Sequence, residues 1–340
     1  MKKQIKLVAV LLVSILMIAT LTACTIDKSK QNANANQFTK SWMSYVNDLA
    51  LVKNIAIAGS NDSALYNTAS FAKTQHFSVA QQLTFGVRYF EINVRLKGDV
   101  LYAFYGSYLG ERIDDILDAV KNFLKNYPTE TVILDFAGFN NQPQEALIAS
   151  IDKYLAVSSY KYIVRKTITS SLDEDFINNL TLSNARGKAI VFMDGDGNEY
   201  LDKQYIFKRN DSNGNRIYSA LQSYYDKDAN KMSSQDYVAS LPNYVAKYKA
   251  SNQGFFVLQG QLHDGPSLQG PAYYESQHQQ NMSNYIINMD ADTVDTINVI
   301  TRNFIDCTKV CQIIALNVQK NNLKPATLEE FKTNLTEFIG

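Results

Sequence analysis

The residues that could do chemistry lie in and just after two predicted strands. In the stretch IAIAGSNDSA, an apolar strand runs into a polar turn that contains Asn61 and Asp62. In YFEINVRL, the alternation of side chains along a strand puts Glu91, Asn93 and Arg95 on one face. Binding and catalytic groups of α/β proteins gather where parallel strands end in polar loops. The two stretches therefore predict a polar ligand-binding or catalytic site.

The polar face of YFEINVRL needs partners. Strands of a parallel sheet are buried on both faces and are usually apolar throughout. Each polar group left unpaired in such a place costs about 1–3 kcal/mol. Two explanations stay open: Glu91 and Arg95 pair with each other inside the protein, or the face binds a ligand.

Seven stretches of the chain are predicted to be strands. They read NIAIAG, VRYFEINVRL, VLYAF, TVILDF, KAIVFMD, GFFVLQGQL and INVITRNFI. Helical patterns separate several of them: apolar residues recur every three or four positions in IDDILDAVKNFLKN, and SSQDYVASLPNYVAKYKA predicts a helix broken near Pro242. Strands that alternate with helices favour a parallel sheet, and about eight such units favour a closed barrel. We therefore expect an α/β protein with one (β/α) barrel domain.

The N-terminus has the features of an export signal. Three lysines precede the apolar run LVAVLLVSILMIATLTA, and LTAC resembles the bacterial lipobox, in which the cysteine becomes the lipidated first residue. Residues 1–23 are therefore predicted to be a lipoprotein signal peptide, with lipidation at Cys24. An uncleaved membrane anchor is the alternative, because the run is about as long as the shortest membrane span.

Two further parts are predicted after the signal peptide. Residues 24–40 are polar and rich in Asn and Gln, which indicates a lipidated cysteine followed by a flexible tether. Residues 41–340 are predicted to form the barrel domain. One lipidated cysteine holds a protein at a membrane without spanning it. We therefore expect a lipid-anchored protein on the extracytoplasmic face of a bacterial cell membrane.

Charge and cysteine content exclude some classes of protein. Without residues 1–23 the chain loses three lysines, so 30 basic residues face 33 acidic ones and the net charge is −3. This balance gives no reason to expect nucleic-acid binding. Cys307 and Cys311 lie four residues apart in a predicted helix, which favours two buried thiols over a strained disulfide. The three histidines do not cluster with cysteines, so no zinc pattern exists.

Several stretches, in one collinear order over about residues 42–310, resemble the phosphatidylinositol-specific phospholipase C family, particularly its bacterial members. WMSYVNDLALVKNIAIAGSNDSA is similar to the family's opening, which contains the motif PGTHDS, and QQLTFGVRYFEINVRL to its QL..GIRYFDIR segment. VKNFLKNYPTETVILDF resembles FL..NPSETIIM, and LSNARGKAIVFMD resembles DARGKIVLL. The resemblance implies an irregular TIM-like barrel and a phosphoric diester hydrolase ancestry.

The resemblance also implies which positions carried the family's reaction. In that reaction the inositol 2-hydroxyl attacks phosphorus, which needs a base, an acid and a cation over the phosphate. The base histidine falls on Asn61, the phosphate-binding arginine on Asn93, the acid histidine on Tyr105, and the carboxylate that orients the base on Asn303. A neutral amide takes no proton near pH 7 and carries no positive charge, and tyrosine has a pKa near 10. The site is therefore predicted to have lost most of its catalytic rate.

Only Asp62, Gly106 and an acidic residue at Glu91 stay within the family pattern. Two groups could still supply chemistry. A relocated base is one, because His263 and Asp264 follow the predicted strand GFFVLQGQL, although HDGP is also an ordinary turn sequence.

A bound calcium ion is the second group that could supply chemistry, as in calcium-dependent relatives of the family. Its oxygen ligands would be Asp62, Glu91, Asn93 and Asp135. The stretches DGDGN, DSNGN and DKDAN begin like calcium loops but lack the later loop positions, so they are predicted to be surface turns.

The predicted function is that of a binding protein with a disabled site. Its ligand would be an inositol phospholipid or another phosphorylated or polyol ligand, held by Glu91, Arg95, Gly106 and the aromatic pair Tyr273–Tyr274. No resident cofactor is expected. The alternative is an active hydrolase or lyase on phosphatidylinositol-like lipids that uses His263 and Asp264 or calcium.

Overall fold

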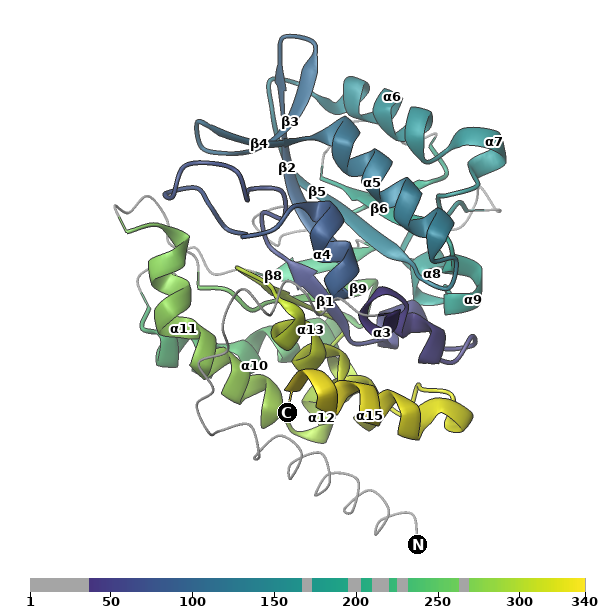
Figure 1. Cartoon of the computed structure of the whole chain (residues 1–340), viewed down its shortest axis with the longest axis vertical. Coiled ribbons are helices and arrows are strands. Elements are labelled where there is room, and N and C mark those ends of the chain that lie inside the picture. The colour runs from purple at the N-terminus through teal and green to yellow at the C-terminus, as the bar shows by residue number, and fades with distance from the viewer. Residues whose placement is uncertain are drawn as a thin grey trace, which may run out of the picture.

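A ring of parallel strands forms the centre of the protein (Figure 1). The structure is a computed structural model and describes residues 37–166, 173–194, 203–209, 220–224, 232–262 and 269–339. The predicted signal peptide, Cys24 and most of the predicted tether lie outside the described residues.

The described residues contain ten strands in one sheet. They are β1 (Ile57–Ser60), β2 (Tyr89–Lys97), β3 (Val100–Tyr105), β4 (Tyr108–Arg112), β5 (Val132–Asn140), β6 (Ala189–Met193), β7 (Ile206–Lys208), β8 (Leu221–Tyr224), β9 (Phe255–Gln259) and β10 (Val299–Arg302). All seven predicted strands are confirmed. Strands β4, β7 and β8 were not predicted, because none of them carries a long apolar run.

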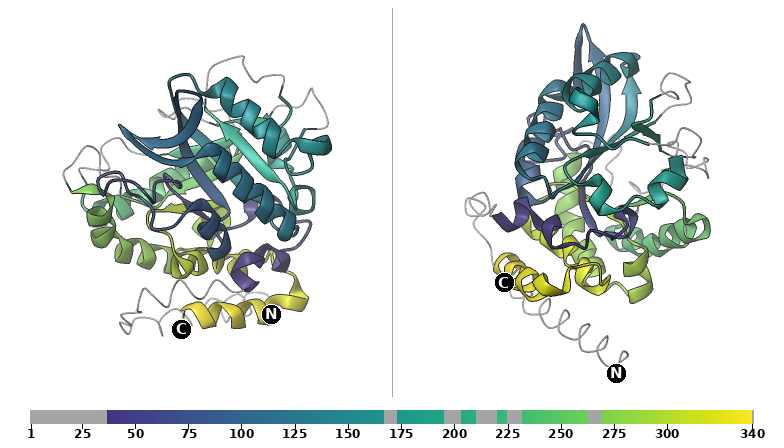
Figure 2. Two further views of the ribbon diagram at one scale, coloured as in Figure 1. Left: turned by 45° about the horizontal axis from the view of Figure 1, so that its top comes forward. Right: turned by 90° about the vertical axis from the view of Figure 1, so that its right-hand side faces the viewer.

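The strand order is that of a nearly closed barrel. Its path runs β7-β6-β5-β2-β1-β10-β9-β8, with parallel pairing throughout. A single parallel bridge between Arg209 and Leu221 links the two ends of this path. The predicted irregular barrel is therefore confirmed, and the weak join between β7 and β8 is its irregular point. Two further views show helices lying around the strands (Figure 2).

Strands β3 and β4 lie outside the ring. β3 pairs antiparallel with β2, and β4 pairs antiparallel with β3. The resulting hairpin projects beyond the barrel at the top of Figure 1. VLYAF is therefore a strand of this antiparallel extension and no part of the parallel ring.

Helices connect the strands and cover the outside of the ring. The longer ones are α4 (Val79–Phe85), α5 (Ile113–Asn126), α6 (Gln144–Tyr154), α10 (Ser234–Ser251), α11 (Gly270–Ile287), α13 (Cys307–Ile314) and α15 (Leu328–Ile339). The shorter ones are α3 (Gln37–Lys40), α7 (Val157–Tyr160), α8 (Asp173–Asn178), α9 (Leu182–Ala185), α12 (Ala291–Thr296), α14 (Leu316–Gln319) and the 3-10 turns η2 (Trp42–Tyr45), η3 (Val52–Asn54) and η6 (Pro325–Thr327).

Helix α10 corrects one prediction. It continues through Pro242, where the sequence predicted a break. Tyr237, Leu241, Val245 and Tyr248 recur every three or four positions and are all buried, so one packed face runs past the proline. Tertiary packing therefore outweighs the missing backbone hydrogen bond.

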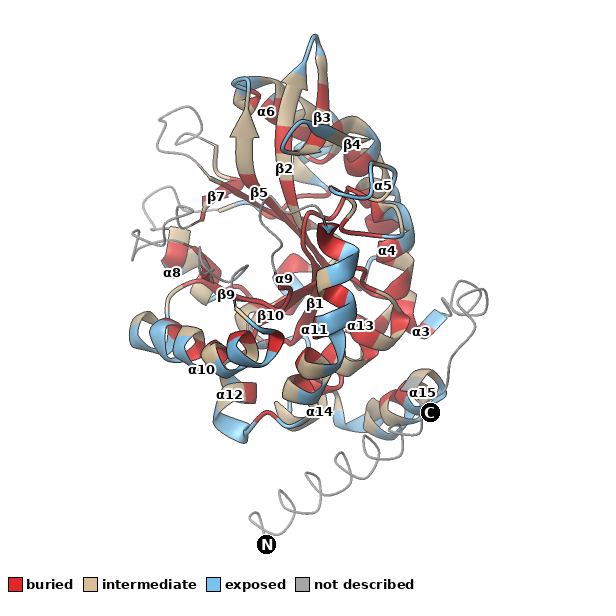
Figure 3. Ribbon diagram, turned by 90° about the vertical axis from the view of Figure 1, so that its left-hand side faces the viewer, coloured by how far each residue is buried: buried red, intermediate tan, exposed pale blue. Residues whose placement is uncertain are grey.

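Buried apolar residues of the strands and of the helix faces that cover them form one core. Figure 3 shows the buried residues in red. Cys307 and Cys311 contribute two buried free thiols to it on α13, as the sequence favoured. Among the described residues, no helix combines the length and the apolar character that crossing a membrane requires.

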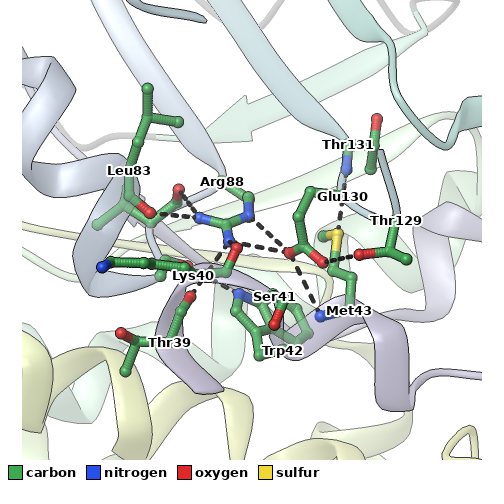
Figure 4. Close-up of polar contacts among 12 residues, drawn as sticks. Thr39, Lys40, Ser41, Trp42, Met43, Leu83, Arg88, Thr129, Glu130 and Thr131 are labelled. Carbon is green, nitrogen blue, oxygen red and sulfur yellow. Dashed lines mark hydrogen bonds and ion pairs between the residues drawn. The ribbon is translucent and has the colours of Figure 1, made fainter. Parts of the chain in front are cut away.

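A buried ion pair ties the N-terminal segment to the barrel (Figure 4). Arg88 Nη2 lies 2.9 Å from Glu130 Oε2, and neither side chain is exposed. The guanidinium also donates to backbone carbonyls of Leu83, Thr39 and Lys40. These contacts fix residues 39–43 beneath the starts of β2 and β5.

The described structure begins at Gln37, four residues before the predicted domain boundary at residue 41. Residues Gln37–Lys40 form α3, in which Phe38 is buried. The Phe38 ring lies 5.4 Å from that of Phe331, edge to face. This apolar contact orders a segment whose composition predicted a tether.

Candidate functional site at the barrel mouth

Two asparagines meet where β1 and β10 end. The parallel register pairs Ser60 with Arg302, so the next residues along both strands leave the sheet side by side. Asn61 Nδ2 donates to Asn303 Oδ1 at 3.1 Å. Both side chains are buried, at 7% and 3% exposed. The contact is a neutral hydrogen bond, and neither amide can take up a proton near pH 7.

A second pair lies beside the first. Asn93 Nδ2 on β2 donates to Asp62 Oδ1 at 2.7 Å. Asp62 has a positive φ of 42°, which turns the chain sharply after β1. A register shift between Ile92 and Asn93 in the pairing with β5 marks an irregularity in β2 at this point. The structure therefore brings Asn61, Asp62, Asn93 and Asn303 together.

A loop after β1 fastens this group. Gln75 Nε2 donates to the carbonyls of Asn61 and Arg302, and Gln75 Oε1 accepts from Ile305 N. Thr74 Oγ1 donates to the Asp62 carbonyl at 2.8 Å. These roles could not be predicted from the sequence, because Gln75 belongs to no motif or strand.

The same loop places His76 near the mouth. Its ring centroid lies 4.5 Å from that of Phe304, the residue after Asn303. His76 is exposed, and it stands 15 positions after Asn61 in the chain, so spacing alone did not connect the two. Of the two described histidines, His76 is the one whose ring lies against Phe304.

Amides and hydroxyls form a further layer on β9 and β10. Gln259 Nε2 donates to Glu91 Oε2 at 3.0 Å and to Ser223 Oγ at 2.7 Å. Thr301 Oγ1 lies 2.8 Å from Gln259 Oε1 and 2.7 Å from Gln261 Oε1. The hydrogen-bond partner of Glu91 on β2 is therefore Gln259 on β9, a strand that does not neighbour β2.

A buried carboxylate lies on β5, the neighbour of β2. Asp135 Oδ1 is 3.1 Å from Arg209 Nε, and Tyr89 donates its hydroxyl to Asp135 Oδ2 at 2.5 Å. Burial raises the pKa of Asp135 to about 6, and the guanidinium of Arg209 opposes this shift. Arg209 was not predicted as a site residue, because it lies at the end of the short, unpredicted β7.

Arg95 turns toward the antiparallel hairpin. Its Nε donates to Asn140 Oδ1 at 2.9 Å and its Nη2 to the Gly106 carbonyl at 2.6 Å. The guanidinium also stacks over Phe104. The pairing of Glu91 with Arg95, one of the two explanations left open, is therefore not formed. The contact with Gly106 holds the end of β3, and with it the half-buried Tyr105, against β2.

A charged network lies behind Asn303. Lys309 Nζ donates to the Asn303 carbonyl at 3.0 Å and to Glu275 Oε1 at 2.7 Å, and Arg302 Nη2 lies 3.1 Å from the same carboxylate oxygen. Glu275 sits on α11 directly after Tyr273 and Tyr274, whose rings meet edge to face at 5.5 Å. This network connects the predicted aromatic pair to the loop that carries Asn303.

The predicted calcium ligands are engaged with other groups. Asp62 accepts from Asn93, and Asp135 faces the cationic Arg209. In the part of the chain that the structure describes, no three His, Cys, Asp or Glu side chains are grouped to hold a metal ion. Calcium stays a prediction that would require these contacts to rearrange. His263, Asp264 and most of the calcium-like turns lie outside the described residues.

Comparison with known proteins decides the family. A family model described as PI-PLC X matches residues 51–251, well over half of the 340 residues. The chain belongs to the PI-PLC X family. The resemblance inferred from the sequence is thereby confirmed.

Curated members of this family match part of the chain. The 1-phosphatidylinositol phosphodiesterase of Listeria monocytogenes is 29% identical over 167 residues, which are 46% of this chain and 49% of that protein. The protein of the same name from Staphylococcus aureus strain Newman is 31% identical over 102 residues, 28% of this chain and 33% of the relative. The matches therefore span about half of these relatives or less.

Solved structures of the family share the fold. Phosphatidylinositol-specific phospholipase C from Listeria monocytogenes superposes with a TM-score of 0.63 at 20% identity, covering 82% of this chain and 98% of that one. A mutant form of the Staphylococcus aureus enzyme gives a TM-score of 0.62 at 20% identity, over 83% and 99% of the two chains. At these identities the likeness establishes the barrel fold.

Proposed function

We propose that this member of the PI-PLC X family is a lipid-anchored binding protein whose barrel mouth has lost phosphodiester chemistry. The observation that carries the proposal is the buried hydrogen bond between Asn61 and Asn303. The resemblance assigns the base and its orienting carboxylate to these two positions. Two amides in contact can hold a ligand, but they cannot accept a proton from an attacking hydroxyl.

The position expected to bind phosphate supports the same conclusion. Asn93 offers no positive charge and gives an N–H to Asp62. A cationic clamp on phosphate is worth about 10³-fold or more in rate, so its loss is not minor. Amides and carboxylates of the mouth suit the hydroxyls of an inositol headgroup or another phosphorylated or polyol ligand.

The test is a combined turnover and binding assay on phosphatidylinositol vesicles. The purified protein should bind the vesicles saturably and release no inositol phosphate above background, with or without calcium. A variant that restores the expected groups, Asn61→His, Asn93→Arg, Tyr105→His and Asn303→Asp together, should gain measurable turnover. Turnover of phosphatidylinositol by the unmodified protein, with or without calcium, would contradict the loss of chemistry.

A second candidate function is residual phosphodiesterase activity. The placement of His76 beside Phe304 favours it, because this histidine lies near the position of the lost base. If the unmodified protein turns over phosphatidylinositol, His76→Ala and His263→Ala identify which histidine acts. The binding-protein proposal then fails, whichever variant loses activity.

A further inference from the structure

A polar cavity of about 610 Å³ lies away from the barrel mouth. It lies beside the amino-terminal ends of β6 and β7, whereas the barrel mouth is at the carboxyl ends of the strands. Two observations place it there: Val164 N donates to the carbonyl of Ala189, where β6 begins, and Tyr205 immediately precedes β7. Binding sites for small molecules commonly measure about 300–1,000 Å³. The cavity is therefore large enough for one sugar-sized ligand.

Two aromatic rings form part of its wall. The centroids of Tyr160 and Tyr205 lie 5.5 Å apart, with the rings tilted by 41°. The Tyr205 hydroxyl donates to Asp152, which fixes the orientation of that ring. Aromatic faces of this kind offer apolar surface to the C–H faces of a ring-shaped polyol.

Two cations lie at the same cavity. Arg165 stacks over the Tyr160 ring at 4.4 Å, and its Nε donates to Gln204 Oε1 at 2.7 Å. The structure gives Nη1 and Nη2 of Arg165 no acceptor within the described part of the chain. Lys203 Nζ lies 3.6 Å from Asp152 Oδ2, longer than an ordinary hydrogen bond. With one carboxylate against two cations, the lining carries a net positive charge.

The backbone at the cavity edge is unusual. Ser158, Ser159 and Tyr160 all have positive φ values, of 49°, 67° and 62°. Each such residue costs about 1–3 kcal/mol unless its surroundings hold it in place. The strained turn presents Ser159 and Tyr160 to the cavity, where the Arg165 stack holds the ring.

We propose that this cavity binds an anionic sugar, either a sugar phosphate or a uronate. The guanidinium of Arg165 and the ammonium of Lys203 would take the anionic group. The Tyr160 and Tyr205 rings would contact the sugar ring, and Gln204 would bond its hydroxyls. This site is independent of the barrel mouth, so it does not rest on the function proposed above.

The test is calorimetric titration of the full-length protein in detergent with four probes: glucose 6-phosphate, glucuronate, glucose and inorganic phosphate. At least one of the two anionic sugars should bind about tenfold or more tightly than glucose and inorganic phosphate do. Whichever anionic sugar binds more tightly shows whether the site prefers a phosphate or a carboxylate group. Arg165→Gln and Lys203→Gln should each weaken that binding about tenfold, since each removes a charge-assisted contact.

Lys161→Gln is the matched control, because Lys161 is an exposed neighbour that lies over Tyr162 and does not line the cavity. This variant should bind within twofold of the unmodified protein. The Tm of each variant checks that the fold is kept. Three results would overturn the proposal: inorganic phosphate that binds as tightly as the stronger anionic sugar, unchanged binding in both cavity variants, or binding of neither anionic sugar.

Discussion

At the scale of single residues, amide side chains make the central contacts of the barrel mouth. The Asn61–Asn303 bond and the Asn93–Asp62 bond join the ends of β1 and β10 to the middle of β2 without a histidine base. A histidine–carboxylate pair in the first position would form a stronger, charge-assisted bond that responds to pH near neutrality. Under the function proposed above, these amides hold the site together and supply no acid–base chemistry.

The buried pair Arg88–Glu130 gives a prediction at the same scale. Glu130→Gln should lower the free energy of unfolding by about 3–5 kcal/mol, because the guanidinium stays buried without its counter-charge. Urea denaturation followed by circular dichroism measures this change. Asp118→Asn is the control: its side chain is half exposed and pairs with Lys121 one turn away, so the change should stay below about 0.5 kcal/mol. Similar values for both variants would contradict the importance of burial.

At the scale of elements, one carboxyl joins β4 to the start of α4. Glu111 Oε2 accepts from Val79 N at 3.0 Å. Burial raises the pKa of Glu111 to about 7, and the bond from Val79 N opposes the shift. The ordinary pKa of a glutamate is near 4.5. Between pH 4.5 and pH 7, Glu111 is therefore mainly protonated in the folded protein and mainly ionised in the unfolded chain.

The contribution of Glu111 to stability should consequently increase as the pH falls from about 7 to about 4.5. Glu111→Gln keeps an acceptor for Val79 N and removes the titration, so it should stabilise the protein at pH 7.5 by about 1–3 kcal/mol. Denaturation of both proteins at a series of pH values measures the difference, which should shrink toward pH 4.5. A difference that does not change with pH would show that Glu111 is ionised throughout.

The unbroken helix α10 gives a second prediction for an element. Pro242 is exposed in the middle of the helix. Pro242→Ala should raise the free energy of unfolding by about 1–3 kcal/mol, because it restores a backbone hydrogen bond at no cost in packing. Thermal and urea denaturation measure the change. The neighbouring exposed substitution Asn243→Ala should have an effect within about 0.5 kcal/mol, and destabilisation by Pro242→Ala would indicate that the helix needs its proline.

At the scale of the whole molecule, the predicted lipid anchor can be tested in a bacterial host. Cys24→Ala should move the protein out of the membrane fraction, because lipidation at this residue is proposed to supply the attachment. Cell fractionation and immunoblotting measure the distribution. Cys307→Ala should leave it unchanged, since that thiol is buried in α13. Retention of the Cys24→Ala protein in the membrane would favour an uncleaved membrane anchor.

Some features could not be read from the sequence because their causes are distant in the chain. Gln75 and His76 belong to no periodic pattern, and a loop that bonds to both β1 and β10 brings them to the mouth. Arg209 ends a strand of three residues, too short to show alternation. Proline usually interrupts a helix, which is why the sequence predicted a break near Pro242, but the buried face of α10 keeps this helix continuous.

The sequence by itself determined the barrel strands with long apolar runs, the two buried thiols and the family, because these depend on local periodicity and collinear motifs. It also named Asn61 and Asn303 as related positions, through the resemblance alone. Only the tertiary structure decided that their amides bond to each other, and that Glu91 pairs with Gln259 and not with Arg95. Partner choice inside a barrel depends on which strands lie opposite, and that arrangement is fixed only when the sheet curls into a ring.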